Sequence, residues 1–500
     1  MTNQQSFAPS TSQFVGLVIG FISFLLVVLM PQPDGLSPSG QGVLALLVLM
    51  AVWWSTEAIP IPATSLLPIV AMPMMGIMPM RAAAAPYADP VIFLLLGGFI
   101  VAMAMQKWNL HQRLALMVIA QVGEKPTALI GGFMIASAIL SMWISNTATT
   151  LMMVPIALSV SATLLARDGA DTEGNETFTV ALLLGCAWSA SIGGLGTIIG
   201  TPPNAFVVSF IERETGQVIE FLDWMKLGVP VVAVMVPAAW LVLTRIAFKV
   251  ENTGNSAGQS VIREKLAALG PITTPEKRVA FVFAGMAFFW IFLAQLKTLP
   301  VFAGLSNAVV AVAGAIIMFL VPHGVKNTET DARLTEPASK SWGLLDWKTA
   351  QDLPWGVLLL FGGGLSLAAA IKATGLALWL GGLLGGLQGL PLILLILSIV
   401  TLVVFLTELT SNTATVAALV PVLAALAATS GIEPILLAAP TAMAASCAFM
   451  LPVATAPNAV VFASGRITIP QMARSGFVLN VIGSFLVTGT CSLLIPLAFL

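Results

Sequence analysis

Two copies of one short polar motif interrupt a chain that is otherwise strongly apolar. The segment Ser145-Asn146-Thr147-Ala148-Thr149 recurs as Ser411-Asn412-Thr413-Ala414-Thr415, 266 positions further along the chain. Hydroxyl and amide groups can bind a cation through oxygen or donate a hydrogen bond to a carboxylate, and they carry no charge themselves. The two motifs therefore favour a site that holds an anion and a metal cation together.

A break in an apolar segment follows each motif. Residues 193–204 read GGLGTIIGTPPN and residues 451–458 read LPVATAPN, and the two share a Thr-x-Pro-Asn-Ala pattern at an offset of 254. Proline removes a backbone donor and frees a carbonyl in the preceding turn, while glycine permits close backbone approach. Freed carbonyls suit Na⁺, and helix N-termini suit a carboxylate. Each break is thus a second candidate part of the same site.

The region around both motifs lacks compensating positive charge. No lysine or arginine lies near either copy in the sequence. A dianion held in a low-dielectric environment requires opposite charge close by. Bound cations are the expected source, and two equivalent motifs predict at least two Na⁺ sites per protomer.

The motifs belong to a longer duplication. The offset of 266 also maps Gly97-Gly98 onto Gly363-Gly364, Leu110 onto Leu376, Ser141 onto Thr407 and Pro155 onto Pro421. We expect five membrane crossings in the first copy, an odd number, so the second copy should be inverted. Inverted repeats are typical of secondary transporters, whose sites lie at the repeat interface near the bilayer midplane.

Composition places these repeats in a membrane. The 500 residues are 58% hydrophobic and 9% charged, with a mean hydropathy of +0.98, whereas soluble chains carry about 25% charged residues. Net charge is −1, which gives no basic surface for nucleic acid. We predict an all-α polytopic membrane protein. Its eleven expected spans are 14–31, 41–58, 61–80, 90–106, 178–211, 227–249, 277–294, 301–321, 354–386, 433–463 and 474–499.

Two further apolar stretches, 126–166 and 391–428, are long enough to enter the membrane and return. A Ser-Asn-Thr cluster at the middle of each predicts a re-entrant hairpin whose polar tip meets other protein groups. With a cytoplasmic N-terminus, only Arg81, Arg213, Lys226 and Lys297 fall in outer loops, and Lys372 lies within a span. The positive-inside rule favours this orientation, with the C-terminus outside.

The expected domain organisation follows from these segments. Residues 1–40 form an N-terminal segment with the first helix, and residues 251–276 form a cytoplasmic linker. The first inverted repeat covers 41–250, with a hairpin at 126–166 and a broken helix at 178–211. The second covers 277–500, with a hairpin at 391–428 and a broken helix at 433–463.

Other classes fit the sequence less well. An intramembrane enzyme would need a nucleophile–base pair or a metal cluster, and the chain has no HExxH motif and no histidine near a polar break. Two half-sites with separate access sides suit alternating access better than a passive channel. Glu57 and Glu408 could relay protons, but we favour hydrogen bonding at helix ends for both. Lys372 could be a buried functional charge, or could pair or snorkel.

Taken together, these motifs closely resemble those of the divalent anion/sodium symporter (DASS) family. The resemblance covers nearly the whole chain. It rests on 53–60 (WWSTEAIP), both SNTAT copies, 191–204 and 446–465 (SCAFMLPVATAPNAVVFASG). It implies an eleven-helix protomer with two re-entrant hairpins, assembled as a homodimer and working by an elevator movement.

The resemblance also implies a ligand set. One Na⁺ would be held by Ser141, Ser145, Asn146 and Gly200, and a second by Thr407, Thr410, Asn412 and Ala454. Substrate carboxylates would meet Ser145, Asn146, Thr147, Thr201, Ser411, Asn412, Thr413 and Thr455. Threonine at position 410 departs from the family pattern, although a backbone carbonyl ligand tolerates a change of side chain.

The expected function is Na⁺-coupled symport of C4-dicarboxylates (succinate, fumarate, malate) across a bacterial inner membrane. The alternative is a Na⁺-independent or proton-coupled exchanger of di- or tricarboxylates with the same fold. Citrate, oxoglutarate and sulfate remain open as substrates. We expect a lipid environment, a homodimer and no enzymatic activity.

Overall fold

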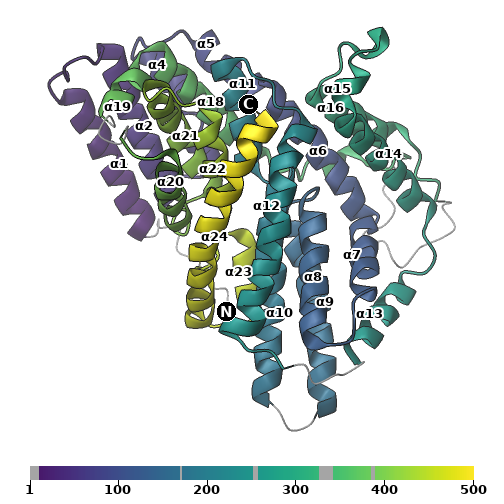
Figure 1. Ribbon diagram of the computed structural model, residues 1–500. Helices are drawn as coiled ribbons and strands as arrows, with labels where there is room; N and C mark the ends of the chain where they lie inside the picture. Colours follow the sequence, from purple (N-terminus) through teal and green to yellow (C-terminus); the bar gives the residue numbers. More distant parts are fainter. Residues whose placement is uncertain (1–10, 169–171, 252–256, 326–341, 384–388, 500) are drawn as a thin grey trace, which may run out of the picture.

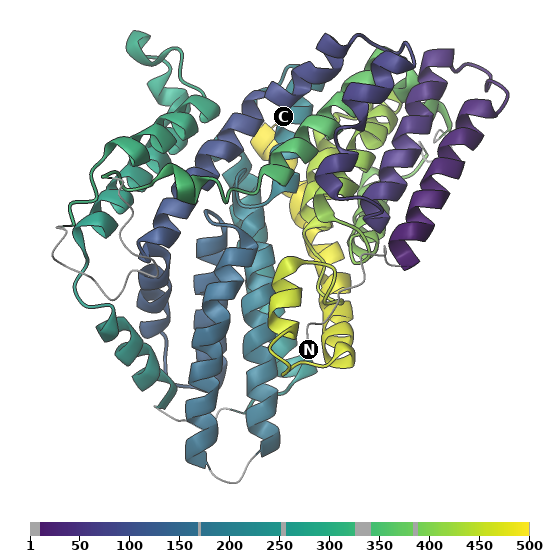
Figure 2. The same cartoon turned by 180° about the vertical axis from the view of Figure 1, so that it is seen from behind.

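The computed structural model describes residues 11–499, apart from 169–171, 252–256, 326–341 and 384–388. The described chain is helical, and Pro322 and Gly343 form an isolated antiparallel bridge. Figures 1 and 2 show long helices α8, α9, α10, α12 and α24 at the centre, with α1, α2 and α18–α21 on one side and α13–α16 on the other. The helices that precede each of the two central sets are α1 (Thr11–Leu29), α2 (Pro38–Thr56), α3 (Ile61–Thr64), α4 (Leu67–Met74), α5 (Met80–Ala84) and η1 (Ala85–Ala88), and then α13 (Ala257–Ala268), α14 (Thr274–Ile291), α15 (Leu293–Leu296), η4 (Pro300–Phe302), α16 (Asn307–Leu320) and α17 (Trp347–Ala350).

The central helices recur in the same order in both halves of the chain. The first set is α6 (Pro90–Lys107), α7 (Leu110–Ala120), α8 (Pro126–Ser141), α9 (Asn146–Asp168), α10 (Thr172–Gly193), η2 (Gly194–Gly196), α11 (Pro202–Thr215), α12 (Phe221–Leu241) and the π-helical turn η3 (Val242–Ala247). The second set is α18 (Trp355–Ala373), α19 (Leu376–Leu383), α20 (Leu392–Leu406), α21 (Asn412–Thr429), α22 (Ile435–Ala445), α23 (Ala456–Phe462) and α24 (Ile469–Phe499). The first residues of some corresponding helices are separated by the same offsets as the sequence repeats, as in α9 with α21 and α11 with α23.

Glycine and proline set the ends of these helices. The expected span 354–386 forms two helices over its described residues, because α18 ends at Ala373 and Gly375 adopts a φ of +75° before α19 begins. A left-handed conformation of this kind ends a helix and is easy only for glycine. Residues 384–386 of this span lie outside the described part of the chain. The hairpin α8/α9 turns over residues 142–145, and α20/α21 turns over 407–411.

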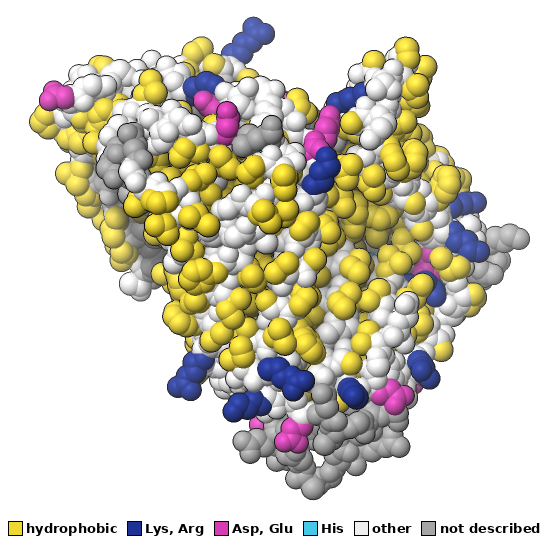
Figure 3. Space-filling model, viewed as in Figure 1, with side chains coloured by type: hydrophobic (Ala, Val, Ile, Leu, Met, Phe, Trp, Pro, Cys, Tyr) yellow, Lys and Arg dark blue, Asp and Glu magenta, His cyan; other side chains and the backbone are white. Residues whose placement is uncertain are grey.

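The outer surface is apolar over most of its height. Seven helical segments in the described part of the chain are long and apolar enough to cross a membrane. Shorter apolar helices such as α16 and α20 accompany them. Large side chains such as Phe281, Leu402 and Phe485 are exposed, at 82%, 61% and 61%. Figure 3 shows hydrophobic side chains across the middle of one face and Lys and Arg side chains toward its margins. This pattern defines a multi-pass membrane protein.

An aromatic cluster packs the α8/α9 turn against other helices. Trp143 stacks on Phe221 of α12 with ring centroids 5.8 Å apart and meets Phe283 of α14 edge-on at 5.0 Å. Trp290 of α14 stacks on Phe221 at 4.6 Å. Aromatic pairs at these spacings stabilise an interface beyond their buried area. The cluster therefore fixes where this turn sits relative to α14.

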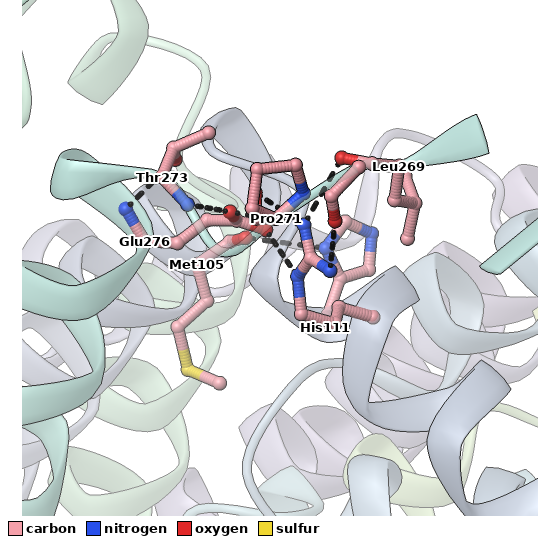
Figure 4. Close-up of polar contacts among 8 residues, drawn as sticks. Met105, His111, Leu269, Pro271, Thr273 and Glu276 are labelled. Carbon is pink, nitrogen blue, oxygen red and sulfur yellow. Dashed lines mark hydrogen bonds and ion pairs between the residues drawn. The ribbon is translucent and has the colours of Figure 1, made fainter. Parts of the chain in front are cut away.

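A buried ion pair ties α7 to the segment that leads into α14 (Figure 4). Arg113 Nε donates to Glu276 Oε1 at 2.8 Å, and its other nitrogens donate to the carbonyls of Leu269, Gly270 and Pro271. Every nitrogen of the guanidinium and both oxygens of the carboxylate have a hydrogen-bond partner, which lowers the cost of burying the charges. The contact joins the two halves of the chain.

Candidate functional site

A cavity of about 1200 Å³ lies where the two hairpin turns meet the two helix breaks. All eight residues expected to contact substrate line it: Ser145, Asn146, Thr147, Thr201, Ser411, Asn412, Thr413 and Thr455. Gly200, Thr410 and Ala454, expected as cation ligands, line it as well. Ser141 and Thr407 do not line the cavity; they are fully buried directly beneath the turns. The structure therefore gathers in one place residues that are more than 300 positions apart.

Helix N-termini converge on this cavity. Helices α9, α11, α21 and α23 begin at Asn146, Pro202, Asn412 and Ala456, all of which line it. The residues before α11 and α23 have nearly the same extended backbone, with φ/ψ of −145°/141° at Thr201 and −142°/150° at Thr455. Free backbone N–H groups and the partial positive charge of a helix N-terminus favour an anion.

Beneath the first turn, oxygen atoms surround the side chain of Asn146. Ser141 Oγ lies 2.6 Å from Asn146 Oδ1. If the amide is turned, its nitrogen would donate to Ser141 Oγ at 2.6 Å and to the carbonyls of Ala190 and Gly200, both at 3.3 Å. The side chain of Asn146 is therefore enclosed by one hydroxyl and two carbonyl oxygens, and the turned amide offers each of them a hydrogen-bond donor.

The second turn repeats this arrangement. Thr407 Oγ1 donates to Asn412 Oδ1 at 2.6 Å and lies 3.0 Å from the carbonyl oxygen of Ala445. Thr410 Oγ1 of this turn lies 2.6 Å from Thr415 Oγ1 at the start of α21. Serine and threonine at equivalent positions therefore make the same contact to equivalent asparagines in both halves.

Close backbone approach brings the first turn onto its helix break. A Cβ atom added to Gly194 would lie 2.8 Å from Asn146 Oδ1 and 3.0 Å from the carbonyl oxygen of Gly200. Thr197 Oγ1 donates to the carbonyl of Met142 at 2.5 Å and accepts from Gly200 N at 3.0 Å. Any larger residue at position 194 would push the turn away from the break. The glycine-rich sequence of the break thus permits the contact on which the site depends.

The charged side chains among the described cavity residues are all acidic. Among the described residues that line the cavity, the ionisable ones are Glu57 and Asp352, and none is a lysine or arginine. No group of three or more His, Cys, Asp or Glu residues in the described chain could hold a metal ion. The ligands available near the turns are therefore neutral oxygens, which suit a monovalent hard cation better than a transition metal.

Glu408 joins the second turn to the second break. Its carboxylate accepts from the backbone N–H groups of Phe449, Met450 and Leu451 at 2.7, 2.9 and 3.0 Å, and from Asn480 Nδ2 at 2.7 Å. The residue is only 3% exposed. Our expectation that Glu408 hydrogen-bonds at a helix end agrees with this geometry.

Glu57 and Lys372 behave differently from Glu408. Glu57 ends α2 with a φ of 48°, is exposed to the cavity and has no hydrogen-bond or ion-pair partner in the described part of the chain. The expected anchoring contact is therefore not made in this conformation. Lys372 is exposed at the surface, 3.2 Å from Glu214 Oε2. It pairs, as one reading of the sequence allowed, and is not a buried charge.

The sequence alone did not identify four residues that contribute polar groups at or next to the candidate site. The carbonyls of Ala190 and Ala445 lie beside the turns, and nothing in an alanine marks its carbonyl as a ligand. Asn204 and Asn458 stood within the recognised breaks without an assigned role, yet both side chains are fully buried and bonded to backbone carbonyls. Their identical placement in the two breaks was the signal that could have found them.

Comparison with known proteins agrees with this architecture. The family profile described as "Sodium:sulfate symporter transmembrane region" matches residues 11–499. The chain is 42% identical over 485 residues to the "Sodium-dependent dicarboxylate transporter SdcS" of Staphylococcus aureus strain MRSA252, covering 96% of this chain and 90% of that protein. The same protein from strain NCTC 8325 / PS 47 gives the same identity and coverage.

Solved structures resemble the fold at low sequence identity. The Neisseria gonorrhoeae protein MtrF, described as illuminating a class of antimetabolite efflux pumps, superposes with a TM-score of 0.57 at 12% identity, covering 98% of this chain and 96% of that one. The YdaH transporter of Alcanivorax borkumensis gives 0.50 at 14% identity, over 97% and 96%. At this identity the likeness concerns the fold alone.

The family profile and the 42% identity to a named transporter show that this membrane protein, whose described residues are helical, is a transporter and not an enzyme. The chain belongs to the divalent anion/sodium symporter family, as the profile match over nearly its whole length and the 42% identity show.

Proposed function

We propose that this protein is a secondary active transporter that carries a C4-dicarboxylate, such as succinate, fumarate or malate, together with Na⁺ across a bacterial inner membrane. The observation that carries the proposal is a cavity bordered by two neutral Ser-Asn-Thr turns and lined by no described lysine or arginine. Its relative's name, sodium-dependent dicarboxylate transporter, supports the same conclusion.

Two equivalent turns suit a substrate with two equivalent ends. Ser145, Asn146 and Thr147 of the first turn and Ser411, Asn412 and Thr413 of the second turn all line the cavity. Each set, with Thr201 or Thr455 at the adjoining helix N-terminus, would hold one carboxylate of the dianion. Two such sets in one cavity favour a dicarboxylate, which has two anionic ends, over a single compact anion such as sulfate.

At least two Na⁺ ions would accompany the substrate. The first would bind among Ser141, Ser145, Asn146 and Gly200, and the second among Thr407, Thr410, Asn412 and Ala454. A dianion in a low-dielectric cavity needs compensating charge, and the described lining offers carboxylates where a cationic side chain would be needed. Two Na⁺ would balance one dianion, and a third would make transport electrogenic.

Ion pairs occur at both ends of the molecule. Glu214–Lys372, Glu220–Lys297 and Asp89–Arg213 lie at the end expected to face outward. Lys107–Asp346 lies at the opposite end. The cavity reaches the ends of α2, α6 and α18 that carry Glu57, Gln106 and Asp352. These ends are cytoplasmic in the proposed topology, with the N-terminus inside and the C-terminus outside, so the conformation is inward-facing.

The two turns differ in a way that fits alternating access between inverted repeats. Trp143 packs in the aromatic cluster with Phe221 and Trp290, whereas Leu409, its repeat equivalent, is 71% exposed on the cavity. In the opposite state these roles would exchange. We therefore propose eleven membrane-spanning helices with two re-entrant hairpins and an elevator movement.

The proposed organisation follows the domain bounds given above: a first repeat over 41–250, a linker over 251–276 and a second repeat over 277–500. The family resemblance supports a homodimer. Lipid would cover the apolar surface.

Uptake into proteoliposomes tests the proposal. Radiolabelled succinate should accumulate when external Na⁺ exceeds internal Na⁺, and replacing Na⁺ by K⁺ or choline should abolish accumulation. Unlabelled fumarate and malate should compete, and citrate, oxoglutarate and sulfate should compete less well. Equal uptake in choline and Na⁺, or uptake that requires internal dicarboxylate, would favour the exchanger of the same fold.

A further inference from the structure

Two asparagine side chains tie the backbone of the two helix breaks in the same way. Asn204 Nδ2 donates to the carbonyls of Gly194 at 3.0 Å and Thr197 at 2.8 Å, with Leu195 O also within 3.3 Å. Asn458 Nδ2 donates to the carbonyls of Ala448 at 3.1 Å and Leu451 at 3.0 Å. In both halves the amide nitrogen thus bonds to the carbonyls of the residues ten and seven positions earlier in the chain.

The offset of 254 relates two of these contacts in the first half to the two contacts in the second half. Asn204 corresponds to Asn458, Gly194 to Ala448, and Thr197 to Leu451. The side chains at these equivalent positions differ, because glycine in the first half corresponds to alanine in the second and threonine corresponds to leucine. Only the asparagine and the backbone carbonyls that it binds are common. The two halves therefore keep one device, a side-chain amide bonded to backbone, while the surrounding side chains differ.

The residues that these two asparagines bind lie next to backbone groups at the edge of the cavity. In the first half, Gly194 lies against both Asn146 Oδ1 and the carbonyl of Gly200. Thr197, the other end of the tie, hydrogen-bonds Gly200 N through its hydroxyl. In the second half, Leu451 O accepts from Ala454 N at 3.2 Å as well as from Asn458. Each asparagine thus holds the turn that presents Gly200 or Ala454 to the cavity.

Burial of these amides shows which of their groups matters. Asn204 and Asn458 are both 0% exposed. Their Oδ1 atoms are buried and have no hydrogen-bond partner among the described residues. Buried polar groups normally have hydrogen-bond partners, so an unpaired Oδ1 in both halves needs a reason. The reason lies in the Nδ2 group of each asparagine, which bonds to carbonyls of the break that no helix amide reaches.

We infer that Asn204 and Asn458 are positioning residues that set the carbonyl geometry of the two cation sites, one asparagine for each site. The inference rests on the proposed function, since it assigns these residues to Na⁺ sites of that transporter. Neither side chain lines the cavity, so each acts through the backbone turn that it holds. Outer groups of this kind typically change metal affinity by about 10–100-fold when removed.

The test is the Na⁺ dependence of succinate uptake by Asn204→Ala and Asn458→Ala in proteoliposomes. Each variant should raise the Na⁺ concentration for half-maximal uptake by about tenfold or more, and saturating Na⁺ should restore most of the maximal rate. Thr441→Val is the matched control. Thr441 is equally buried in α22 and, among the described residues, donates to Leu437 O of its own helix, so the Na⁺ dependence of this variant should stay at the wild-type value.

A purely structural role would give a different result. Variants that fold poorly would lower the maximal rate in proportion to the protein lost, with the half-maximal Na⁺ concentration unchanged, and that outcome would overturn the inference. If an alanine variant is not monodisperse, the corresponding Asn→Ser variant replaces it and must meet the same criterion. The shift in Tm on adding NaCl in place of KCl, measured on purified protein, should shrink in the same variants.

The two proposals fail separately. If wild-type uptake does not depend on Na⁺, the proposed function is wrong. If wild-type uptake depends on Na⁺ and both asparagine variants keep the wild-type half-maximal concentration, only the positioning role is wrong.

Discussion

Replacing Glu408 by glutamine tests how the second turn is held to the second break. The shape of the side chain is kept, but the atom at the Oε2 position becomes an NH₂ group that faces the N–H of Leu451, now bonded at 3.0 Å. One buried backbone donor is then left unpaired, which costs about 1–3 kcal/mol. The three remaining bonds, from Phe449, Met450 and Asn480, change from charge-assisted to neutral acceptors at about 1 kcal/mol each.

Part of this loss is offset, because a neutral amide costs less to bury than a carboxylate. We therefore expect Glu408→Gln to destabilise the protein by about 2–4 kcal/mol, and Glu408→Ala, which orphans all four donors, to destabilise it more. The assay is Tm of purified protein in detergent. Met142 occupies the equivalent position in the first half and contributes its carbonyl there, so Met142→Leu is the control and should change Tm little. Wild-type Tm in both Glu408 variants would refute the reasoning.

Three further predictions concern the turns and the ion pair of Lys107 with Asp346. Asn146→Ala and Asn412→Ala should each abolish uptake in monodisperse protein, because alanine cannot offer both an oxygen to a cation and an NH₂ to a carboxylate; near-normal uptake in either would contradict the assigned role. Leu409→Cys should react with a membrane-impermeant maleimide from the cytoplasmic side faster than Trp143→Cys, since Leu409 is 71% exposed and Trp143 is packed among aromatic rings; wild type is the unreactive control because its cysteines are buried, and the reverse order would refute the assignment. Burial raises the pKa of Asp346, but hydrogen bonds from Lys107 and Thr349 hold that pKa well below its ordinary value. The stability that this carboxylate contributes is therefore present above about pH 3.9 and is lost as pH falls further. Asp346→Asn should lower Tm equally at pH 7 and pH 5, and a Tm difference from wild type that disappears already at pH 5 would contradict this.

The repeated motifs predicted where the chain turns because turn chemistry is local. Serine and asparagine favour helix N-termini, and α9 and α21 begin at the asparagine of each motif. Glycine and proline likewise determined the two breaks, where α11 and α23 begin at the residue after Thr201 and Thr455. Residue spacing alone was enough for these features.

Long-range partners could not be predicted in the same way. Glu408 could have faced water, a proton path or a helix end, and only packing against residues 449–451 decides that it accepts backbone N–H groups. The ties of Asn204 and Asn458 depend on how each break folds back on itself. The division of span 354–386 into α18 and α19 depends on one glycine with positive φ. Periodicity does not encode such choices, because they are made by tertiary contacts.

The most direct test of the central claim is succinate binding to the purified protein at several Na⁺ concentrations and constant ionic strength. If Na⁺ compensates the dianion in a cavity lined by no described cationic side chain, each ligand must raise the affinity for the other by the same factor. The account predicts that the apparent Kd for succinate falls steeply as Na⁺ replaces K⁺. A Kd that stays constant across the Na⁺ series would contradict it.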